Sequence, residues 1–190
     1  MAYYATSAEL KTRLGSPTGV GEAELAAANA FAQQWIEWYC GRRFLAVTAT
    51  RYYDRAALDP ANRKILLLDD DLLTVTTLTN ANTEATVITS NQYWLWPRNE
   101  TPKWGIRLKT DYTFEFDTDC FIGVAGSWGY SATPDGLVKG CALRLAQWYH
   151  QSKNMVDVTT IFNDTVNRER PPSWPSDVET DLWPYRRLCP

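Results

Sequence analysis

The chain has 190 residues with 45% hydrophobic content and nine tryptophans, a size and composition that suit one domain or a body with a subdomain. Its formal net charge of -3 excludes the broad basic surface that non-specific nucleic-acid binding needs. No apolar run approaches the roughly 18 residues that span a bilayer, and the first residues lack the basic start and apolar stretch of a signal peptide. We therefore expect a globular protein with no membrane segment.

Two helices are predicted before residue 41. Thr6 and Glu9 have the spacing of a capping box, which predicts a short helix to about Leu14. A long helix is expected over residues 21–40, followed by Gly41, which suits the left-handed conformation that ends many helices. One apolar stripe runs along this long helix and consists of Leu25, Ala28, Ala32, Trp35 and Tyr39.

The segment after the long helix is rich in Thr, Val, Tyr and Trp, and its pattern predicts an antiparallel sheet. The turns between the apolar runs are too short for the helical crossovers that parallel strands need. Asp69, Asp70 and Asp71 separate two of the runs and are interpreted as a charged turn rather than a metal site. Strands are expected over residues 47–53, 64–68, 72–79, 85–89, 93–96, 105–108, 112–116 and 121–125.

A second long helix is expected to begin with Thr133 as its N-cap and Pro134 as its first residue, and to end near Lys153. Its apolar stripe complements that of the first long helix, so we expect the two helices to pack closely. The stripe consists of Val138, Ala142, Leu145 and Tyr149.

The pattern weakens after Asn154. Residues 170–175 are interpreted as an extended linker, and Ser176 with Glu179 forms a second capping box that predicts a short helix to about Arg187. The predicted fold class is α+β: a small helical bundle body with an antiparallel β subdomain inserted between the two long helices. The expected divisions are a helical body over residues 1–45 and 131–153, the β subdomain over 46–130, and an extended C-terminal segment with a short helix over 154–190.

The sequence contains no HExxH, GxSxG, P-loop or paired metal-ligand motif. His150 is the only histidine, and its place near a helix end favours a structural role over that of a general base. The cysteines show no CxxC spacing, and Cys40 and Cys141 lie on apolar helix faces, which predicts free thiols and synthesis in a reducing cytoplasm. We expect no enzyme activity, no cofactor and no metal.

Acidic residues alternate with aromatic residues in and beside the expected strand 112–116. At strand spacing, Asp111, Glu115, Asp117 and Asp119 share one face, opposite the aromatic side chains. This face is either a solvated face of the sheet or an acidic wall that repels phosphate, as the lining of a DNA channel would.

Four residues near the ends of the β segment are candidates for a subunit interface. Arg42 and Arg43 follow the long helix and either compensate its last carbonyl groups or contact an acidic neighbouring subunit. Glycines at every third position over residues 123–129 suit a turning strand end that brings Trp128 and Tyr130 close to a neighbour.

Several short phrases occur in a characteristic order. Residues 36–44 form a helix end with Ile-Glu-Trp followed by Gly-Arg, residues 51–54 are Arg-Tyr-Tyr-Asp, and residues 126–130 lead through a proline into a helix. Together they resemble the head-to-tail connector (adaptor) proteins of long-tailed bacteriophages. The resemblance spans residues 5–153, and the segment 175–187 is also similar to such proteins.

This resemblance implies a structural protein of the virion neck that is made in the host cytoplasm. Such proteins form a dodecameric ring beneath the portal, continue the DNA channel, and offer a platform for a stopper or tail-terminator protein. They are not enzymes, and packaged DNA passes through them without specific binding. The large β insert departs from the smallest members, which are nearly all helical.

The resemblance also implies a partner for the C-terminal segment, because in similar proteins this segment commonly reaches the portal. Aromatic anchors on Pro-rich, weakly helical sequence suit docking into grooves of another subunit. The alternative is a tail packed on its own helices, since aromatic residues also fill cores. The expected portal-binding residues are Trp174, Trp183, Tyr185, Arg186 and Arg187.

The sequence leaves three other functions open. A Trp-rich β module that binds carbohydrate or another ligand would be monomeric and would present Trp94, Trp96 and Trp104 in one groove. A hydrolase that uses carboxylates distant in sequence would have a deep pocket with raised carboxyl pKa values. Another neck or tail-end ring protein is the third alternative.

Overall fold

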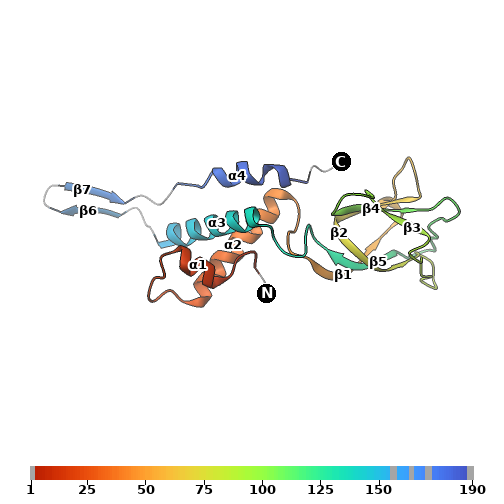
Figure 1. Cartoon of the computed structure of the whole chain (residues 1–190), viewed down its shortest axis with the longest axis horizontal. Helices are drawn as coiled ribbons and strands as arrows, with labels where there is room; N and C mark the ends of the chain where they lie inside the picture. The colour runs from red at the N-terminus through yellow and green to blue at the C-terminus, as the bar shows by residue number, and fades with distance from the viewer. Residues whose placement is uncertain (1–2, 155–157, 163–164, 170–172, 188–190) are drawn as a thin grey trace. The chain divides into compact units, whose positions relative to one another are not determined.

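The computed structural model describes residues 3–154, 158–162, 165–169 and 173–187 (Figure 1). The chain forms two compact units: the helical unit, Met1–Gly41 with Pro134–Pro190, and the β unit, Arg42–Thr133. The predicted class is confirmed, because the chain is α+β and its antiparallel sheet is inserted in sequence between the two long helices.

The helical unit begins with the predicted short and long helices. Thr6 and Glu9 form the capping box: the Thr6 side chain accepts from the N–H of Glu9, and the Glu9 carboxylate accepts from the N–H of Thr6. Gly41 follows the first long helix with a φ of 63°, as predicted. The helices are α1 Ser7–Arg13, α2 Glu22–Cys40 and α3 Gly136–Asn154.

The start of α3 differs from the prediction. Asp135, not Thr133, caps the helix, because its Oδ1 accepts a hydrogen bond from the backbone N–H of Val138 at 2.9 Å. The other carboxylate oxygen accepts from the hydroxyl of Tyr185. Burial acts to raise the pKa of Asp135, but the hydrogen bonds from Tyr185 and the helix backbone outweigh it and lower the pKa.

The predicted pairing of α2 with α3 is confirmed (Figure 1). The buried stripe of α2 differs from the prediction at its end: Ile36 and Cys40 are buried, whereas Trp35 and Tyr39 are half-buried. At about 100° per residue, Ile36 returns to the face of Leu25 while Trp35 lies about 80° to the side. The predicted stripe residues that are buried are Leu25, Ala28, Ala32, Val138, Ala142 and Leu145.

The C-terminal segment contains two strands that the sequence pattern did not predict. β6 Val158–Phe162 and β7 Thr165–Glu169 form an antiparallel hairpin. The predicted short helix is present as α4 Asp177–Leu182, and it continues into a 3-10 turn, η2 Trp183–Tyr185. Ser176 precedes α4 but makes no capping hydrogen bond with its side chain, so the second capping box is not formed.

Five antiparallel strands form the sheet of the β unit, in the order β1-β5-β2-β4-β3. The long strand β2 pairs with β4 through its first residues and with β5 through its last. The register between β2 and β4 shifts between Leu67 and Leu72, where β2 changes partners. The strands are β1 Val47–Tyr53, β2 Ile65–Thr79, β3 Tyr93–Trp96, β4 Lys103–Leu108 and β5 Ile122–Trp128; a short 3-10 turn, η1 Arg55–Ala57, follows β1.

Residues 69–71 do not form the turn that the sequence predicted. The three aspartates lie inside β2, which runs without interruption through both expected strands. Arg42 and Arg51 pair with them. A run of like charges is tolerated in a strand here because cations from elsewhere in the fold relieve the repulsion.

Residues 85–89 and 112–116 were predicted to be strands, and each forms only one isolated bridge. Each segment makes backbone hydrogen bonds with residues 78–81, and side-chain amides supply further ones. Asn82 Oδ1 accepts from the backbone N–H of Thr86 at 2.8 Å, and Asn80 Oδ1 accepts from that of Glu115 at 3.2 Å. The Asn82 bond is local and competes with strand pairing, whereas the Asn80 bond joins residues 35 positions apart, so alternating sequence was not sufficient for a regular strand.

The core of the β unit surrounds Trp128, whose side chain is 1% exposed. Its indole N–H donates to the carbonyl oxygen of Ala49 at 3.0 Å, which satisfies its single polar group. Gly126 lies on the same strand and allows a close approach, because a Cβ there would sit 2.1 Å from the carbonyl oxygen of Thr74. Other core residues are Leu66, Leu72, Leu78, Ile106, Leu108, Ile122 and Val124.

Cys40 and Cys141 are buried thiols outside any disulfide, as predicted, and Cys120 is a half-buried thiol. Burial raises the pKa of the Cys141 thiol and outweighs the attraction of the neighbouring Arg144 guanidinium. Cys189 lies outside the described residues. A search of the described helices found none long and apolar enough to cross a membrane.

Candidate functional site

A row of stacked aromatic side chains in the helical unit joins three elements that are far apart in the sequence. Trp35 and Tyr39 of α2 stack face to face, with ring centroids 5.0 Å apart. Trp174 of the C-terminal segment lies 5.0 Å from Trp35 and 4.8 Å from Trp148 of α3. Aromatic pairs at these distances gain free energy beyond the area they bury, so the row holds the C-terminal segment against both long helices.

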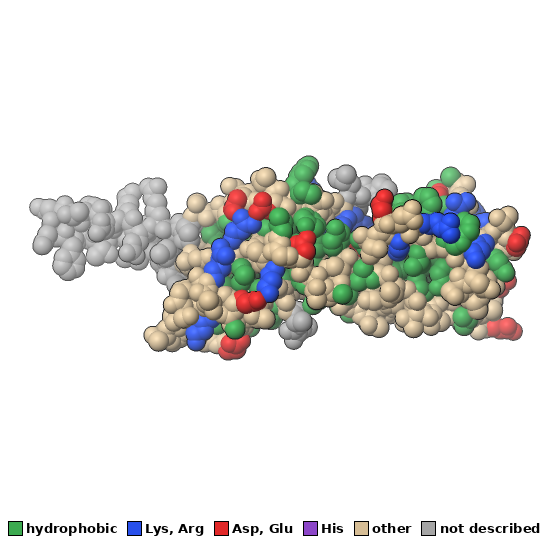
Figure 2. All heavy atoms as spheres, in the orientation of Figure 1, with side chains coloured by type: hydrophobic (Ala, Val, Ile, Leu, Met, Phe, Trp, Pro, Cys, Tyr) green, Lys and Arg blue, Asp and Glu red, His purple; other side chains and the backbone are tan. Residues whose placement is uncertain are grey.

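Buried and charged contacts extend this docking along α4. Val178 and Leu182 are fully buried, and the guanidinium of Arg144 pairs with Asp177 and Asp181. Burial acts to lower the pKa of Arg144, but its acidic partners, with the hydrogen bond to Asp181 foremost, raise it. Basic and acidic side chains accordingly lie side by side over the helical unit in Figure 2.

The C-terminal segment also forms hydrogen bonds with the last turn of α2. The backbone N–H of Arg187 donates to the carbonyl oxygen of Cys40 at 2.7 Å. The hydroxyl of Tyr39 donates to the carbonyl oxygen of Glu179 at 3.1 Å. One of the last carbonyl groups of α2, which the helix cannot satisfy internally, therefore finds its partner in the segment 173–187.

Two large aromatic side chains near this row remain exposed: Trp38 is 76% exposed and Trp183 is 61% exposed. The guanidinium of Arg186 lies 5.2 Å from the ring centroid of Tyr39 and 5.0 Å from that of Trp183. We call Trp38, Tyr39, Trp183 and Arg186 the aromatic–arginine surface; hydrophobic side chains reach the surface over the end of α4 in Figure 2. Trp, Tyr and Arg are the residues that dominate binding hot spots.

The five residues expected to bind the portal separate into two groups. Trp174 and Tyr185 make their contacts within the helical unit, and the backbone of Arg187 does the same. The alternative expectation, a tail packed on its own helices, therefore describes these three residues. Trp183 and Arg186 lie on the surface and are available to a partner.

Trp38 was not among the candidates from the sequence. At about 100° per residue it lies about 140° around α2 from Leu25, well off the buried face. A tryptophan in that position is the signal that could have identified it, because a large exposed apolar side chain often marks a contact surface.

The acidic residues of segment 111–119 do not share one face of a strand, because no strand forms there. Asp117 Oδ2 accepts from the backbone N–H and the hydroxyl of Thr83, at 2.7 and 2.8 Å, and these bonds lower the pKa of Asp117. The geometry that suggested a channel wall is therefore absent. The four side chains are all exposed: Asp111, Glu115, Asp117 and Asp119.

The four residues expected at a subunit interface differ in their accessibility. Trp128 is in the core of the β unit and is not available to a neighbour. Arg42 Nε lies 3.5 Å from the buried Asp71 carboxylate, and its guanidinium is 5.0 Å from the ring centroid of Tyr130, so both residues serve the fold of the β unit. Arg43 is exposed and stays a candidate for a subunit contact.

Arginine rather than metal neutralises the other aspartates of β2. Arg51 contacts Asp69 at 3.0 Å and Asp70 at 2.6 Å, and its guanidinium lies 4.5 Å from the ring centroid of Trp128. Burial acts to raise the pKa of Asp69, but the Tyr53 hydroxyl and Arg51 outweigh it and lower the pKa. Within the described residues, no group of three or more His, Cys, Asp or Glu side chains could hold a metal ion.

The hydrolase alternative requires carboxyl groups with raised pKa values. Where the pKa of a described carboxyl departs from its ordinary value, at Glu9, Asp69, Asp117 and Asp135, the pKa is lowered. His150 Nε2 lies 3.5 Å from a carboxylate of α2 and so bridges the two long helices. The described residues therefore give no support to acid–base catalysis.

The ligand-binding alternative requires open aromatic platforms in the β unit. Trp94 and Trp104 are 37% and 43% exposed, and Trp96 meets Trp104 edge-on with ring centroids 6.1 Å apart. The guanidinium of Arg98 lies over Trp94, 4.5 Å from its ring centroid. The side chain of Arg98 thus covers the ring face of Trp94 on which a sugar would stack.

No protein-family model matches the chain, and no curated protein matches it. Several solved structures do. A chain in the structure titled "Neck of empty GTA particle computed with C6 symmetry" aligns with a TM-score of 0.65 and 16% identity, covering 96% of this chain and 89% of that chain.

Two related structures give similar values. The "Neck of native GTA particle computed with C12 symmetry" aligns at a TM-score of 0.62 and 16% identity, covering 96% of this chain and 88% of that chain. The "Virion of native gene transfer agent (GTA) particle" aligns at 0.62 and 17% identity, covering 96% and 89%. The resemblance to neck proteins inferred from the sequence is thus confirmed in the fold, and the chain has the fold of a chain from the neck of a phage-like gene transfer agent particle.

Proposed function

We propose that this chain is a structural component of the neck of a phage-like particle: a connector whose copies form a ring that joins the capsid portal to the tail. The observation that carries the proposal is the alignment of 96% of the chain, both units included, with chains of neck structures. The C12 symmetry named for one of these structures supports a ring of twelve copies. Such a ring continues the DNA channel without binding DNA specifically and needs no cofactor or catalytic residue.

We assign the portal contact to the aromatic–arginine surface. Trp183 and Arg186 come from the C-terminal segment expected to reach the portal, and Trp38 and Tyr39 of α2 extend the surface beyond it. A partner that covers rings as exposed as Trp38 and Trp183 removes their apolar area from water. The segment 173–187 is already docked on α2 and α3, so little ordering of its backbone opposes binding.

Electron microscopy of the purified chain, alone and mixed with its portal, tests the proposal. We expect rings that attach to the portal, and we expect tailed particles to contain the chain at their neck. Trp38→Ala with Trp183→Ala should weaken portal binding at least about tenfold while the chain stays folded, because hot-spot truncations cost about 2 kcal/mol or more each. Trp104→Ala, a change at an exposed tryptophan of the β unit, is the matched control and should bind normally.

His150→Gln should leave ring formation and portal binding intact. A chain that is missing from the neck of assembled particles, or that never binds portal under any tested condition, would overturn the connector function.

A further inference from the structure

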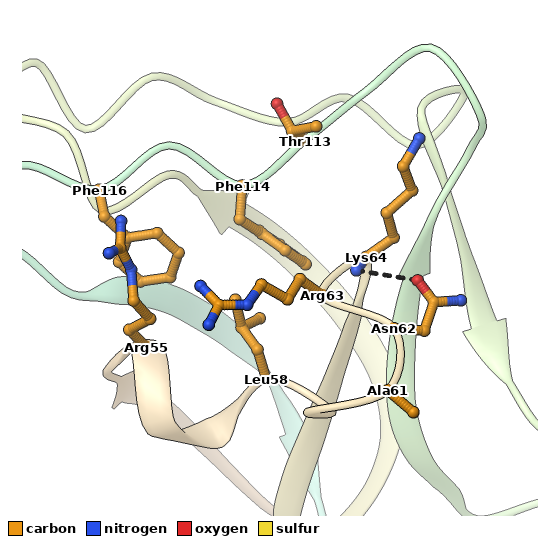
Figure 3. A pocket seen from close by; sticks show the side chains of 9 residues that line it. All are labelled: Arg55, Leu58, Ala61, Asn62, Arg63, Lys64, Thr113, Phe114 and Phe116. Atoms are coloured by element: carbon orange, nitrogen blue, oxygen red, sulfur yellow. Dashed lines mark hydrogen bonds between the residues drawn. The ribbon is translucent and has the colours of Figure 1, made fainter.

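A hollow of about 390 Å³ in the β unit is lined by arginine and phenylalanine side chains. Figure 3 shows the guanidinium group of Arg55 beside the ring of Phe116, and that of Arg63 extending into the hollow next to Leu58. Arg55 lies over Phe116, 5.2 Å from the ring centroid. The ammonium group of Lys64 is directed away and donates to a backbone carbonyl oxygen. We call this site, defined by Arg55 and Arg63, the arginine hollow.

The arginine hollow holds two positive charges without a carboxylate partner among the described residues. Arg42, Arg51 and Arg144, in contrast, each pair with an aspartate. The acidic residues near the hollow in sequence are engaged elsewhere: Asp54 accepts from backbone N–H groups of η1, and Asp59 accepts from the N–H of Ala61. Two guanidinium groups in one hollow repel each other, and a bound anion would relieve that repulsion.

Residues 111–116 contribute side chains to the lining of two hollows. Phe114 and Phe116 line the arginine hollow, whereas Glu115 Oε2 accepts from Asn82 Nδ2 at 2.9 Å. A second hollow, of about 220 Å³, has Asp111 and Glu115 in its lining. We call it the acidic hollow. Both carboxylates are exposed and line the acidic hollow, whereas Arg55 and Arg63 line the arginine hollow.

We propose that two neighbouring copies in the ring meet at these hollows. Asp111 and Glu115, at the rim of the acidic hollow of one copy, bind in the arginine hollow of the next copy. The inference rests on the proposed ring. A head-to-tail ring contact needs two different, complementary patches on each subunit, and the β unit presents a cationic patch at Arg55 and Arg63 and an anionic patch at Asp111 and Glu115. Arginine suits a carboxylate partner because its planar group forms paired hydrogen bonds, and Arg55 and Arg63 are both exposed and so accessible to a neighbouring copy.

A phosphate group is the less suitable occupant. The chain carries a net charge of -3, and exposed carboxylates occupy the same segment as the hollow, so nucleic acid would be repelled on approach. The acidic rim of a neighbouring copy is the better occupant, since its carboxylates pair directly with the guanidinium groups of the arginine hollow.

The test uses two charge-reversed forms of the full chain, Arg55→Glu with Arg63→Glu and Asp111→Arg with Glu115→Arg. Self-association is measured by sedimentation velocity over a concentration series and at two salt concentrations. Each form alone should associate at least about tenfold more weakly than wild type, because repulsion replaces attraction at every contact. An equal mixture of the two forms should recover association, since every contact between unlike copies pairs opposite charges.

Two controls match the changes in number and sign. One control carries Arg98→Glu with Arg107→Glu, and the other carries Glu84→Arg with Glu100→Arg. Both alter β-unit residues outside the two hollows and should associate as wild type does. Failure of the mixture to recover association would overturn the proposal, as would a wild-type chain that stays monomeric throughout the series. Portal binding and location at the particle neck, measured separately, then decide the connector function independently.

Discussion

The indole ring of Trp174 meets that of Trp148 edge-on, with ring centroids 4.8 Å apart and an interplanar angle of 83°. The two residues are 26 positions apart in the chain (174 − 148), and the hairpin β6–β7 lies between them in sequence. This contact returns the chain to α3 and makes the segment 173–187 part of the helical unit. It leaves Trp183 and Arg186 on the surface.

Replacing Trp174 should therefore destabilise the helical unit. We expect Trp174→Ala to lower the free energy of unfolding by about 2–4 kcal/mol, somewhat less than the truncation of a fully buried tryptophan because this side chain is half-buried. Urea unfolding followed by far-UV circular dichroism measures the change. Trp183→Ala is the control and should shift stability by less than about 0.5 kcal/mol, as exposed substitutions usually do. Equal losses from the two variants would contradict the assignment.

The pairing of α2 with α3 can be tested at one buried leucine. Leu145 is fully buried, so Leu145→Ala should cost about 2–5 kcal/mol of unfolding free energy through lost burial and the cavity that remains. Leu137 is on the same helix and is 42% exposed, and Leu137→Ala should have little effect. If Leu145→Ala proved neutral in the same urea titration, the helix pairing would be wrong.

Two glycines should respond to alanine in opposite directions. Gly126→Ala should disrupt the β unit, because the new Cβ would lie 2.1 Å from a backbone oxygen of the paired strand. Gly140→Ala in α3 meets open space and should stabilise the helical unit by about 0.5–1 kcal/mol through helix propensity. Thermal unfolding with separate probes for sheet and helix measures both. A fully stable Gly126→Ala chain would rule out the close pairing of β5 with β2.

The ion pair that links α1 to α3 should give the chain a specific sensitivity to acid. The hydrogen bond from Lys139, then that from the backbone N–H of Thr6, lowers the pKa of Glu9 from 4.5 to about 2. Because the folded pKa is the lower one, this stabilisation is present above the unfolded pKa and is lost as pH falls from about 4.5 to about 2.

Lys139→Met should therefore raise the pKa of Glu9 and reduce that pH dependence, although the hydrogen bond from the Thr6 N–H remains. Lys11→Met, an exposed change in α1, should leave both as they are. NMR titration of the Glu9 carboxyl group gives the pKa directly. Titration of Glu9 near its ordinary value in the unaltered chain would show that the Lys139 contact does not form in solution.

Local signals in the sequence were sufficient for the helices and for much of the sheet. The capping box at Thr6 and the left-handed Gly41 depend only on near neighbours, and both are present. Apolar periodicity indicated the two long helices, and their order around a β-rich segment gave the α+β class. The resemblance to neck connectors rested on short motifs in that same order, and the fold matches chains of neck structures.

Contacts between residues distant in the sequence decided the rest. Residues 69–71 remain in a strand because Arg42 and Arg51, brought there by the fold, offset their charge. Segment 112–116 has the alternation of a strand, yet only an isolated bridge forms, and the N–H of Glu115 bonds to the side chain of Asn80. Periodicity shows which face of an element is apolar, but it does not show which other segment will pack against that face. The packing of Trp174 on α2 and α3, and the exposure of Trp38, therefore depended on the tertiary structure.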